Sequence, residues 1–187
     1  TLTNYGQFLE KFPPKDEVVI KPVSSWSCCH GVGRWMEDCG CSTGGEAGWN
    51  QKWRKPLREA LDFLRDKLAE VTELEGKKIF KDVWSARNDY ISVILDRSFN
   101  SVNGFFKNNL LTDVNADGAL KALRLMEIQR QCLLMYTSCG WFFNELSGLE
   151  TVQIMKYAAR AMQLAKMFTD ENLETEFLDI LENAKSN

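Results

Sequence analysis

The chain has 187 residues and a formal net charge of -3, with 44% hydrophobic and 26% charged residues. This length and apolar content suit one domain with a sizeable core, which excludes a disordered chain. The scattered lysines and arginines exclude a basic footprint for nucleic acid. The first 20 residues lack the apolar stretch and cleavage site of a signal peptide, and no apolar run approaches the roughly 20 residues of a membrane span. We therefore expect a cytoplasmic protein with no nucleic-acid or membrane partner, and the start at Thr1 suggests a fragment of a longer chain.

The first predicted element is a short helix over residues 2–12. Aromatic and leucine side chains recur there at helical spacing up to Phe12. Pro13 ends the pattern because proline lacks the backbone donor. The β-branched run in residues 18–23 then predicts an extended connector or a lone edge strand.

Residues 26–53 form an unusual segment. They hold four of the six tryptophans, four of the six cysteines, six of the twelve glycines and the only histidine. The rest of the chain has the pattern of ordinary amphipathic helices. We expect a functional surface to include Trp26, His30, Trp35 or Trp49.

Apolar side chains at three- and four-residue steps predict helices through the rest of the chain. The predicted helices cover residues 56–71, 80–95, 117–139, 147–165 and 170–184. With almost no strand signal, the fold class is all-α. We expect a helical bundle of about five to six helices with a Gly/Trp/Cys-rich N-terminal loop segment and little or no strand.

The domain organisation follows from this pattern. We expect residues 1–187 to form a single helical domain, in which residues 1–55 are an extended, loop-rich lead-in and residues 56–187 the bundle. Neither an internal repeat nor a low-complexity linker divides the chain.

Several polar and sulfur side chains have predicted structural roles in the helices. Arg87 lies on an apolar seam and is expected to be partly buried beside an acidic partner. Cys132 and Cys139 fall in one apolar row and are expected to pack in the core. Ser147 is predicted to cap the helix that follows it in a capping box, and Asp170 to cap the last helix.

Four soft ligands lie close together in the unusual segment: Cys28, His30, Cys39 and Cys41. Zinc prefers thiolate and imidazole ligands in a tetrahedral arrangement. Zinc-binding cysteine pairs usually leave about two to four residues between them, whereas Cys39-Gly-Cys41 leaves one and Cys28-Cys29 leaves none. The spacing favours structural thiols in a tight loop, with a disulfide or a zinc site as the alternatives.

Two further patterns are rejected as sites. Cys29 and His30 could make a nucleophile and a base, but no third residue orients them and adjacent side chains tend to point apart. Residues 113–118 match the first half of a calcium loop, whose last position should carry a bidentate glutamate. That position is Arg124, which repels calcium. Residues 113–118 therefore predict a turn with a helix N-cap.

The tryptophans in the glycine-rich loops are candidates for stacking on sugar rings. Ligand sites combine apolar walls with a few placed polar groups. Trp53 and Trp84 lie at helical spacing and are expected in the core, which is also the alternative for the loop tryptophans. The candidate ligand-binding residues are Trp26, His30, Arg34, Trp35, Asp38, Trp49, Asn50, Trp141 and Glu145.

Five stretches resemble a domain of unknown function that follows the catalytic barrel in glycoside hydrolase family 57-like proteins. They are residues 25–35, 38–41, 48–61, 136–145 and 150–160. The resemblance implies a C-terminal piece of a larger bacterial or archaeal protein that acts on α-glucans or related polysaccharides. The family's catalytic glutamate and aspartate lie on the barrel, so no catalytic residue is carried over to this chain. Cys29 departs from the family, which usually has a small residue there.

We therefore expect a non-catalytic accessory domain that walls the carbohydrate cleft of an upstream catalytic barrel in the same polypeptide. By analogy with related enzymes, residues 26–50 and 141–145 would face that barrel. The expected partners are the barrel and an α-glucan or related polysaccharide, with no cofactor, and the fragment alone should be inactive. The alternatives are a purely structural interdomain packing module and a small zinc-binding module.

Overall fold

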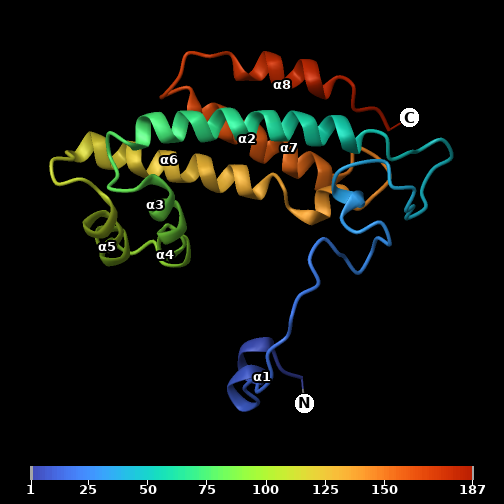
Figure 1. Ribbon diagram of the computed structural model, residues 1–187, viewed down its shortest axis with the longest axis horizontal. Helices are drawn as coiled ribbons and strands as arrows, with labels where there is room; N and C mark the ends of the chain where they lie inside the picture. The colour runs from blue at the N-terminus through green and yellow to red at the C-terminus, as the bar shows by residue number, and fades with distance from the viewer. Residues whose placement is uncertain (1, 187) are drawn as a thin grey trace.

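Four antiparallel helices form the bundle at the centre of the fold (Figure 1). The computed structural model describes residues 2–186, which confirm the all-α prediction. Their nearest approach to a strand is an isolated antiparallel bridge between Phe80 and Leu110. The elements are α1 (Tyr5–Lys11), η1 (Gly33–Trp35), α2 (Arg54–Gly76), α3 (Val83–Asp89), α4 (Ile91–Leu95), α5 (Phe99–Asn109), α6 (Ala116–Leu134), η2 (Ser138–Trp141), α7 (Leu149–Ala165) and α8 (Leu173–Leu181).

The direction of the four bundle helices decides where the functional segment lies. α2 and α7 run one way and α6 and α8 the other, with α6 packed on α7 and α2 packed on both α6 and α8 (Figure 1). The first turns of α2 and α7 and the last turn of α6 therefore meet at one end, on the right in Figure 1. The loop of residues 26–53 lies at this end, and α3 to α5 lie toward the other.

The core forms because α2 presents one apolar stripe to its neighbours. Leu57, Leu64 and Leu68 are fully buried, and each such burial stabilises the fold by about 1.5–3 kcal/mol. A polar contact continues the stripe, since Gln129 of α6 donates Nε2 to Thr72 Oγ1 of α2 at 2.9 Å. Both side chains are buried, so this hydrogen bond satisfies groups that have lost water.

The helix predicted over residues 80–95 is wrong, because two short helices occupy this stretch. Tyr90 ends α3 and begins α4. Its ring is buried with its centroid 5.5 Å from that of Phe105 in α5. α5 was not predicted, because its asparagines and glycine are weak helix formers; burial of Phe105 stabilises it through tertiary packing.

The capping box predicted at Ser147 is wrong. Its hydroxyl donates to Glu145 Oε2 at 2.6 Å in a tight turn. α7 instead begins after Gly148, which supplies no side-chain cap. The Ser147 hydroxyl therefore bonds within the turn that precedes α7 and does not cap that helix.

Of the two other predicted helix caps, one is wrong and one is confirmed. Asp170 does not cap the last helix, because α8 starts later and Asn172 Oδ1 accepts from the Thr175 backbone N–H at 3.3 Å. The N-cap predicted within residues 113–118 is confirmed. Asn115 Oδ1 accepts from the Gly118 N–H at 2.9 Å and starts α6.

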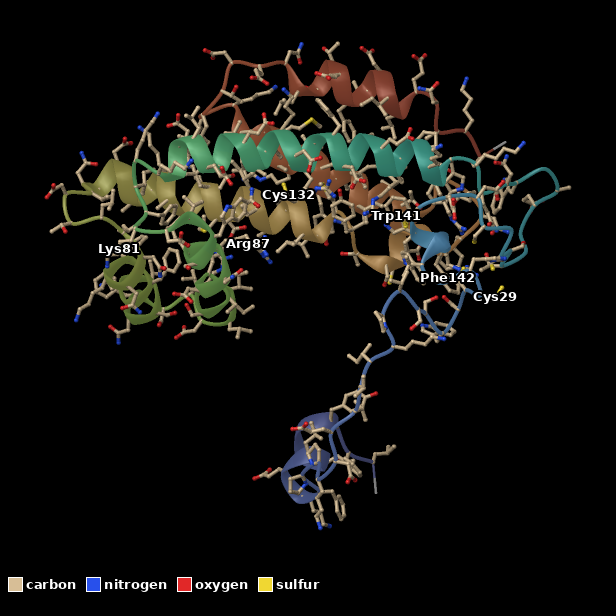
Figure 2. All side chains as sticks on the ribbon, viewed as in Figure 1. Cys29, Lys81, Arg87, Cys132, Trp141 and Phe142 are labelled. Carbon is tan, nitrogen blue, oxygen red and sulfur yellow. The ribbon has the colours of Figure 1, made fainter. Side chains whose placement is uncertain are left out.

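Two packing predictions also need correction. Arg87 is half-buried as expected, yet among residues 2–186 no carboxylate pairs with it, and its guanidinium lies 5.6 Å from the Trp84 ring centroid. Trp84 is itself half-buried rather than in the core, because its Nε1 donates to Glu73 Oε1 at 2.9 Å. Cys132 is buried inside the bundle as predicted (Figure 2), whereas Cys139 is exposed because α6 ends before it.

The N-terminal segment stands apart from the bundle (Figure 1). The predicted short helix is confirmed as α1, but none of its residues is buried. Residues 18–21 have no regular secondary structure, residues 22–23 form a turn in which Val23 has a φ of 51°, and none of residues 18–23 forms a strand. Within residues 2–186, no helix combines the length and apolar character needed to cross a bilayer.

Candidate functional site

The loop of residues 26–53 folds against the turn that joins α6 to α7. Arg34 of η1 is buried and donates Nη1 to the Phe142 carbonyl at 2.9 Å and Nη2 to the Ser27 carbonyl at 3.0 Å. The Trp35 indole Nε1 donates to the Ser138 carbonyl at 3.1 Å. The bonds from Arg34 to Phe142 and from Trp35 to Ser138 join residues 108 and 103 positions apart, so only the folded chain creates the site.

Arg54, at the start of α2, forms hydrogen bonds to the same turn between α6 and α7. Its side chain is 0% exposed. It donates to the Phe143 carbonyl at 3.1 Å and to Gln51 Oε1 at 3.0 Å. Burial lowers the pKa of this guanidinium, and Cys39 opposes that shift. Arg54 was not among the predicted site residues, although a charged residue directly after a core tryptophan indicates a buried charge.

Asn144 organises the glycine-rich part of the loop. This buried amide donates Nδ2 to Ser42 Oγ and to the Gly44 carbonyl, both at 2.7 Å. Its Oδ1 accepts from Gln51 Nε2 at 3.2 Å. Asn144 was not predicted as a site residue either, because its hydrogen-bond partners lie about a hundred residues earlier in the sequence.

Cys28, His30, Cys39 and Cys41 converge on one point. Their sulfur and imidazole nitrogen atoms all lie within 4.8 Å of one another. The short spacing between Cys39 and Cys41 does not prevent this, because Gly40 has a φ of 75° that turns both sulfurs inward. The short spacing therefore does not keep the two sulfurs apart in this loop.

The disulfide alternative is not realised in this structure. All six cysteines, which lie within the described residues, are free thiols. The adjacent side chains of Cys29 and His30 do not point apart as expected, since Cys29 Sγ lies 3.6 Å from His30 Nδ1 and 3.7 Å from Nε2. Cys29 is exposed at the surface of this end of the bundle (Figure 2).

The thiols of the cluster differ in acidity. Burial disfavours ionisation of Cys28, but backbone hydrogen bonds from His30 and Arg34 outweigh it and lower its pKa to about 6. Burial raises the pKa of Cys39. The lowered pKa favours the thiolate form of Cys28 at neutral pH.

An aromatic groove of about 300 Å³ lies beside the cluster. Trp26 is 89% exposed and stacks on Phe142 with 6.2 Å between ring centroids. Figure 2 shows Phe142 at the same end as Cys29. The structure thus brings together the predicted Trp26 and Trp35 with six residues absent from the predicted set. The lining residues are Trp26, Ser27, Trp35, Ser138, Cys139, Phe142, Phe143 and Glu150.

Four other predicted residues lie outside the aromatic groove. Trp49 and Glu145 line a separate groove of about 550 Å³. The Asn50 backbone N–H donates to the Ser186 carbonyl at 3.0 Å near that groove. Asp38 is exposed and lines neither groove.

Trp141 and Arg34 support the site from within. Trp141 is 1% exposed and stacks on Trp53 with 6.4 Å between centroids, which confirms Trp53 as a core residue. Figure 2 shows Trp141 directed into the bundle. A ring with both faces covered cannot stack on a sugar, and both Arg34 amino groups are already bonded to carbonyls. Both residues were predicted to contact a ligand, and in this structure both are buried.

Comparison with known proteins gives one family. The model for the family described as domain of unknown function (DUF3536) matches residues 49–187. The matched span includes the bundle and the turn that carries Phe142, whereas Trp26 and the cysteine cluster precede it. No curated protein and no solved structure matches the chain.

Proposed function

The chain belongs to the DUF3536 family, domains of unknown function, and we propose that it is a non-catalytic accessory domain of a glycoside hydrolase family 57-like protein. In this proposal the aromatic groove forms one wall of the carbohydrate cleft of an upstream catalytic barrel in the same polypeptide. The ligand is an α-glucan or a related polysaccharide. We place the protein in the cytoplasm of a bacterium or archaeon.

The exposed indole of Trp26 beside the groove is the observation that carries this proposal. A sugar ring presents an apolar C–H face that packs on an aromatic ring and hydroxyls that need polar partners. The groove offers both, because Trp26, Phe142 and Phe143 supply rings and Glu150 supplies a carboxylate. Its walls come from three of the stretches on which the resemblance rests.

The carboxylates near the groove support a non-catalytic role. Glycoside hydrolysis needs two carboxyl groups, about 5–5.5 Å apart for retention or about 6.5–9.5 Å for inversion. Glu150 is the single carboxylate among the lining residues. Glu145 lines the other groove and Asp38 lines neither. Catalysis is therefore assigned to the barrel, and the isolated chain is expected to be inactive.

A second candidate role is interdomain packing without ligand contact. Leu149, which directly precedes Glu150, is 86% exposed. Phe143 is also exposed on the groove. Exposed apolar side chains of this kind mark surfaces that another protein surface covers. In this role the barrel would cover the groove, and the groove would not contact sugar.

Calorimetric titration with maltooligosaccharides separates the two roles. We expect saturable binding by the wild-type chain and at least about tenfold weaker binding by Trp26→Ala, a loss of about 1.4 kcal/mol. Calorimetry avoids the loss of a fluorescent reporter in that variant. Phe99→Ala is the matched control, because Phe99 is a 79% exposed aromatic residue on α5, away from the groove.

The results have clear meanings. Binding that Phe99→Ala retains and Trp26→Ala loses supports the carbohydrate role. No saturable heat with the wild-type chain refutes that role and leaves interdomain packing. Equal weakening by both variants also refutes it, because the groove would then not be the binding surface.

A further inference from the structure

We propose that Cys28, His30, Cys39 and Cys41 bind one Zn²⁺ ion that fixes the loop carrying Trp26 and Trp35. The four residues are the described ones whose ligand atoms lie within 4.8 Å of one another. This inference does not depend on the carbohydrate proposal, because it concerns what shapes the loop rather than what the groove binds.

The distances inside the cluster match a tetrahedral zinc site. Zinc–sulfur bonds of about 2.3 Å and zinc–nitrogen bonds of about 2.0 Å place two sulfurs about 3.8 Å apart, and a sulfur and a nitrogen about 3.5 Å apart. Cys41 Sγ lies 3.8 Å from Cys28 Sγ and 3.5 Å from His30 Nδ1. Cys28 Sγ lies 3.9 Å from the same nitrogen. The nitrogen that faces the sulfurs, Nδ1, is the proposed ligand.

These separations do not fit a disulfide. A disulfide bond is about 2.05 Å long, whereas the sulfurs of Cys28 and Cys41 are 3.8 Å apart. Without a metal, hydrogen bonds among these thiols would stabilise the arrangement only slightly, because thiols are weak hydrogen-bond donors and acceptors. A shared cation explains why four soft ligands point to one centre.

Buried polar side chains hold the proposed ligands from outside. Gln51 donates Nε2 to the Cys41 carbonyl at 2.6 Å, and Arg54 donates Nη1 to Cys39 Sγ at 3.6 Å. Such outer-shell contacts orient the ligands of zinc sites and tune their charge. They also connect the cluster to α2, so a bound ion would tie the loop to the bundle.

The charge of the surroundings favours a zinc tris-thiolate. Arg34 and Arg54 are both buried. Among the residues described, neither makes a salt bridge with a carboxylate. Buried cations need a compensating negative charge. Zn²⁺ with three thiolates and one neutral imidazole carries one net negative charge, and Arg54 already lies against Cys39.

The ligand set also identifies the kind of metal and the role of the site. Three thiolates and one imidazole in tetrahedral geometry favour zinc over magnesium, calcium or manganese, which prefer oxygen. Four protein ligands leave no open position for water or substrate. The ion is therefore structural, and its removal should loosen the loop rather than abolish a reaction.

Metal analysis of the purified full chain tests the site. We expect about one zinc ion per chain after expression with added zinc and dialysis against a weak chelator. Cobalt substitution should give thiolate-to-cobalt charge-transfer bands and the intense visible bands of tetrahedral cobalt. Less than about 0.2 zinc per chain, or a cobalt spectrum without thiolate bands, would overturn the proposal.

Matched variants test which residues bind the ion. Cys41→Ser is expected to reduce zinc to below about 0.2 per chain, whereas Cys29→Ser should keep about one, because Cys29 lies outside the four-ligand set. Loss of zinc from both variants would refute this ligand set. If Cys41→Ser fails to fold, the cobalt spectrum of the wild-type chain, compared with that of Cys29→Ser, still decides.

Discussion

At the scale of single residues, the site depends on buried polar groups that the apolar pattern does not reveal. Arg54 and Asn144 are both buried and bond to backbone or side-chain oxygens of distant loop segments. Burial of such groups costs stability unless hydrogen bonds replace those lost to water. Their partners lie far away in sequence, so the residues were unremarkable until the chain was folded.

Arg54→Lys should lower the free energy of unfolding by about 2–4 kcal/mol, because lysine cannot reach the Phe142, Phe143 and Gln51 oxygens together. Urea denaturation followed by circular dichroism measures the change. The control is Arg160→Lys on α7, where the exposed arginine donates Nη1 to Gln163 Oε1 at 3.3 Å. The free energy of unfolding of that control should stay within about 0.5 kcal/mol of wild type. Equal losses in both variants would show that the hydrogen bonds of Arg54 do not hold the turn in place.

Glu127 is expected to make the free energy of unfolding depend on pH. Burial raises its pKa, but hydrogen bonds from Arg97, Tyr90 and Arg130 outweigh burial and lower the pKa from 4.5. A carboxyl whose folded pKa is lowered stabilises the fold above its unfolded pKa, and this contribution disappears as the pH falls through the folded pKa.

Glu127→Gln should therefore cost about 1–2 kcal/mol of unfolding free energy at pH 7, and the difference from wild type should shrink below about pH 4. Urea denaturation across that pH range measures it. Glu70→Gln, at an exposed position on α2, is the control and should leave the pH dependence unchanged. A difference that stays constant from pH 7 to acid would contradict the prediction.

At the scale of elements, helix contacts leave room for some side chains and not for others. Gly140 in η2 lies against α7, where an added Cβ would be 2.7 Å from two carbons of Ile154. Gly104 in α5 has open space around the same position. The two glycines therefore predict opposite effects of one substitution.

Gly140→Ala should destabilise the chain by about 1–3 kcal/mol, because Ile154 is buried and cannot move aside without strain. Gly104→Ala should stabilise it by about 0.5–1 kcal/mol, because alanine loses less backbone entropy in a helix. Thermal unfolding of both variants checks the pair. Similar shifts in one direction would show that the turn and α7 are not in close contact.

At the scale of the whole molecule, the N-terminal segment and the bundle are separate parts joined by an extended chain (Figure 1). α1 has no buried residue, and the cluster of ligands begins only after residue 25. Stability should therefore come from the bundle and the loop packed on its end.

A chain that begins at Lys21 should keep the thermal midpoint of the full chain within about 1 °C, because deletion removes no buried apolar surface. Differential scanning calorimetry of the two chains measures this. A fall of more than about 4 °C would mean that α1 contributes packing to the bundle.

The sequence by itself determined the fold class and the bundle helices. The stripes in residues 56–71 and 117–139 predicted most of α2 and of α6, with the second prediction running past the end of α6, because amphipathic periodicity is local and a helix must bury its apolar face. The same reasoning failed for α3 to α5, where Phe105 stabilises a poor helix-forming sequence. Composition alone also identified residues 26–53 as unusual.

Only the tertiary structure decided what each member of that segment does. It left Trp26 exposed and buried Trp141, although both tryptophans lie outside the bundle helices. It also brought Cys28 to Cys41 through the turn at Gly40. Periodicity reports which face of one element is buried, but not which distant segment covers it. Loop contacts depend on backbone turns and long-range packing, so the groove and the cysteine cluster emerge only when the chain closes on itself.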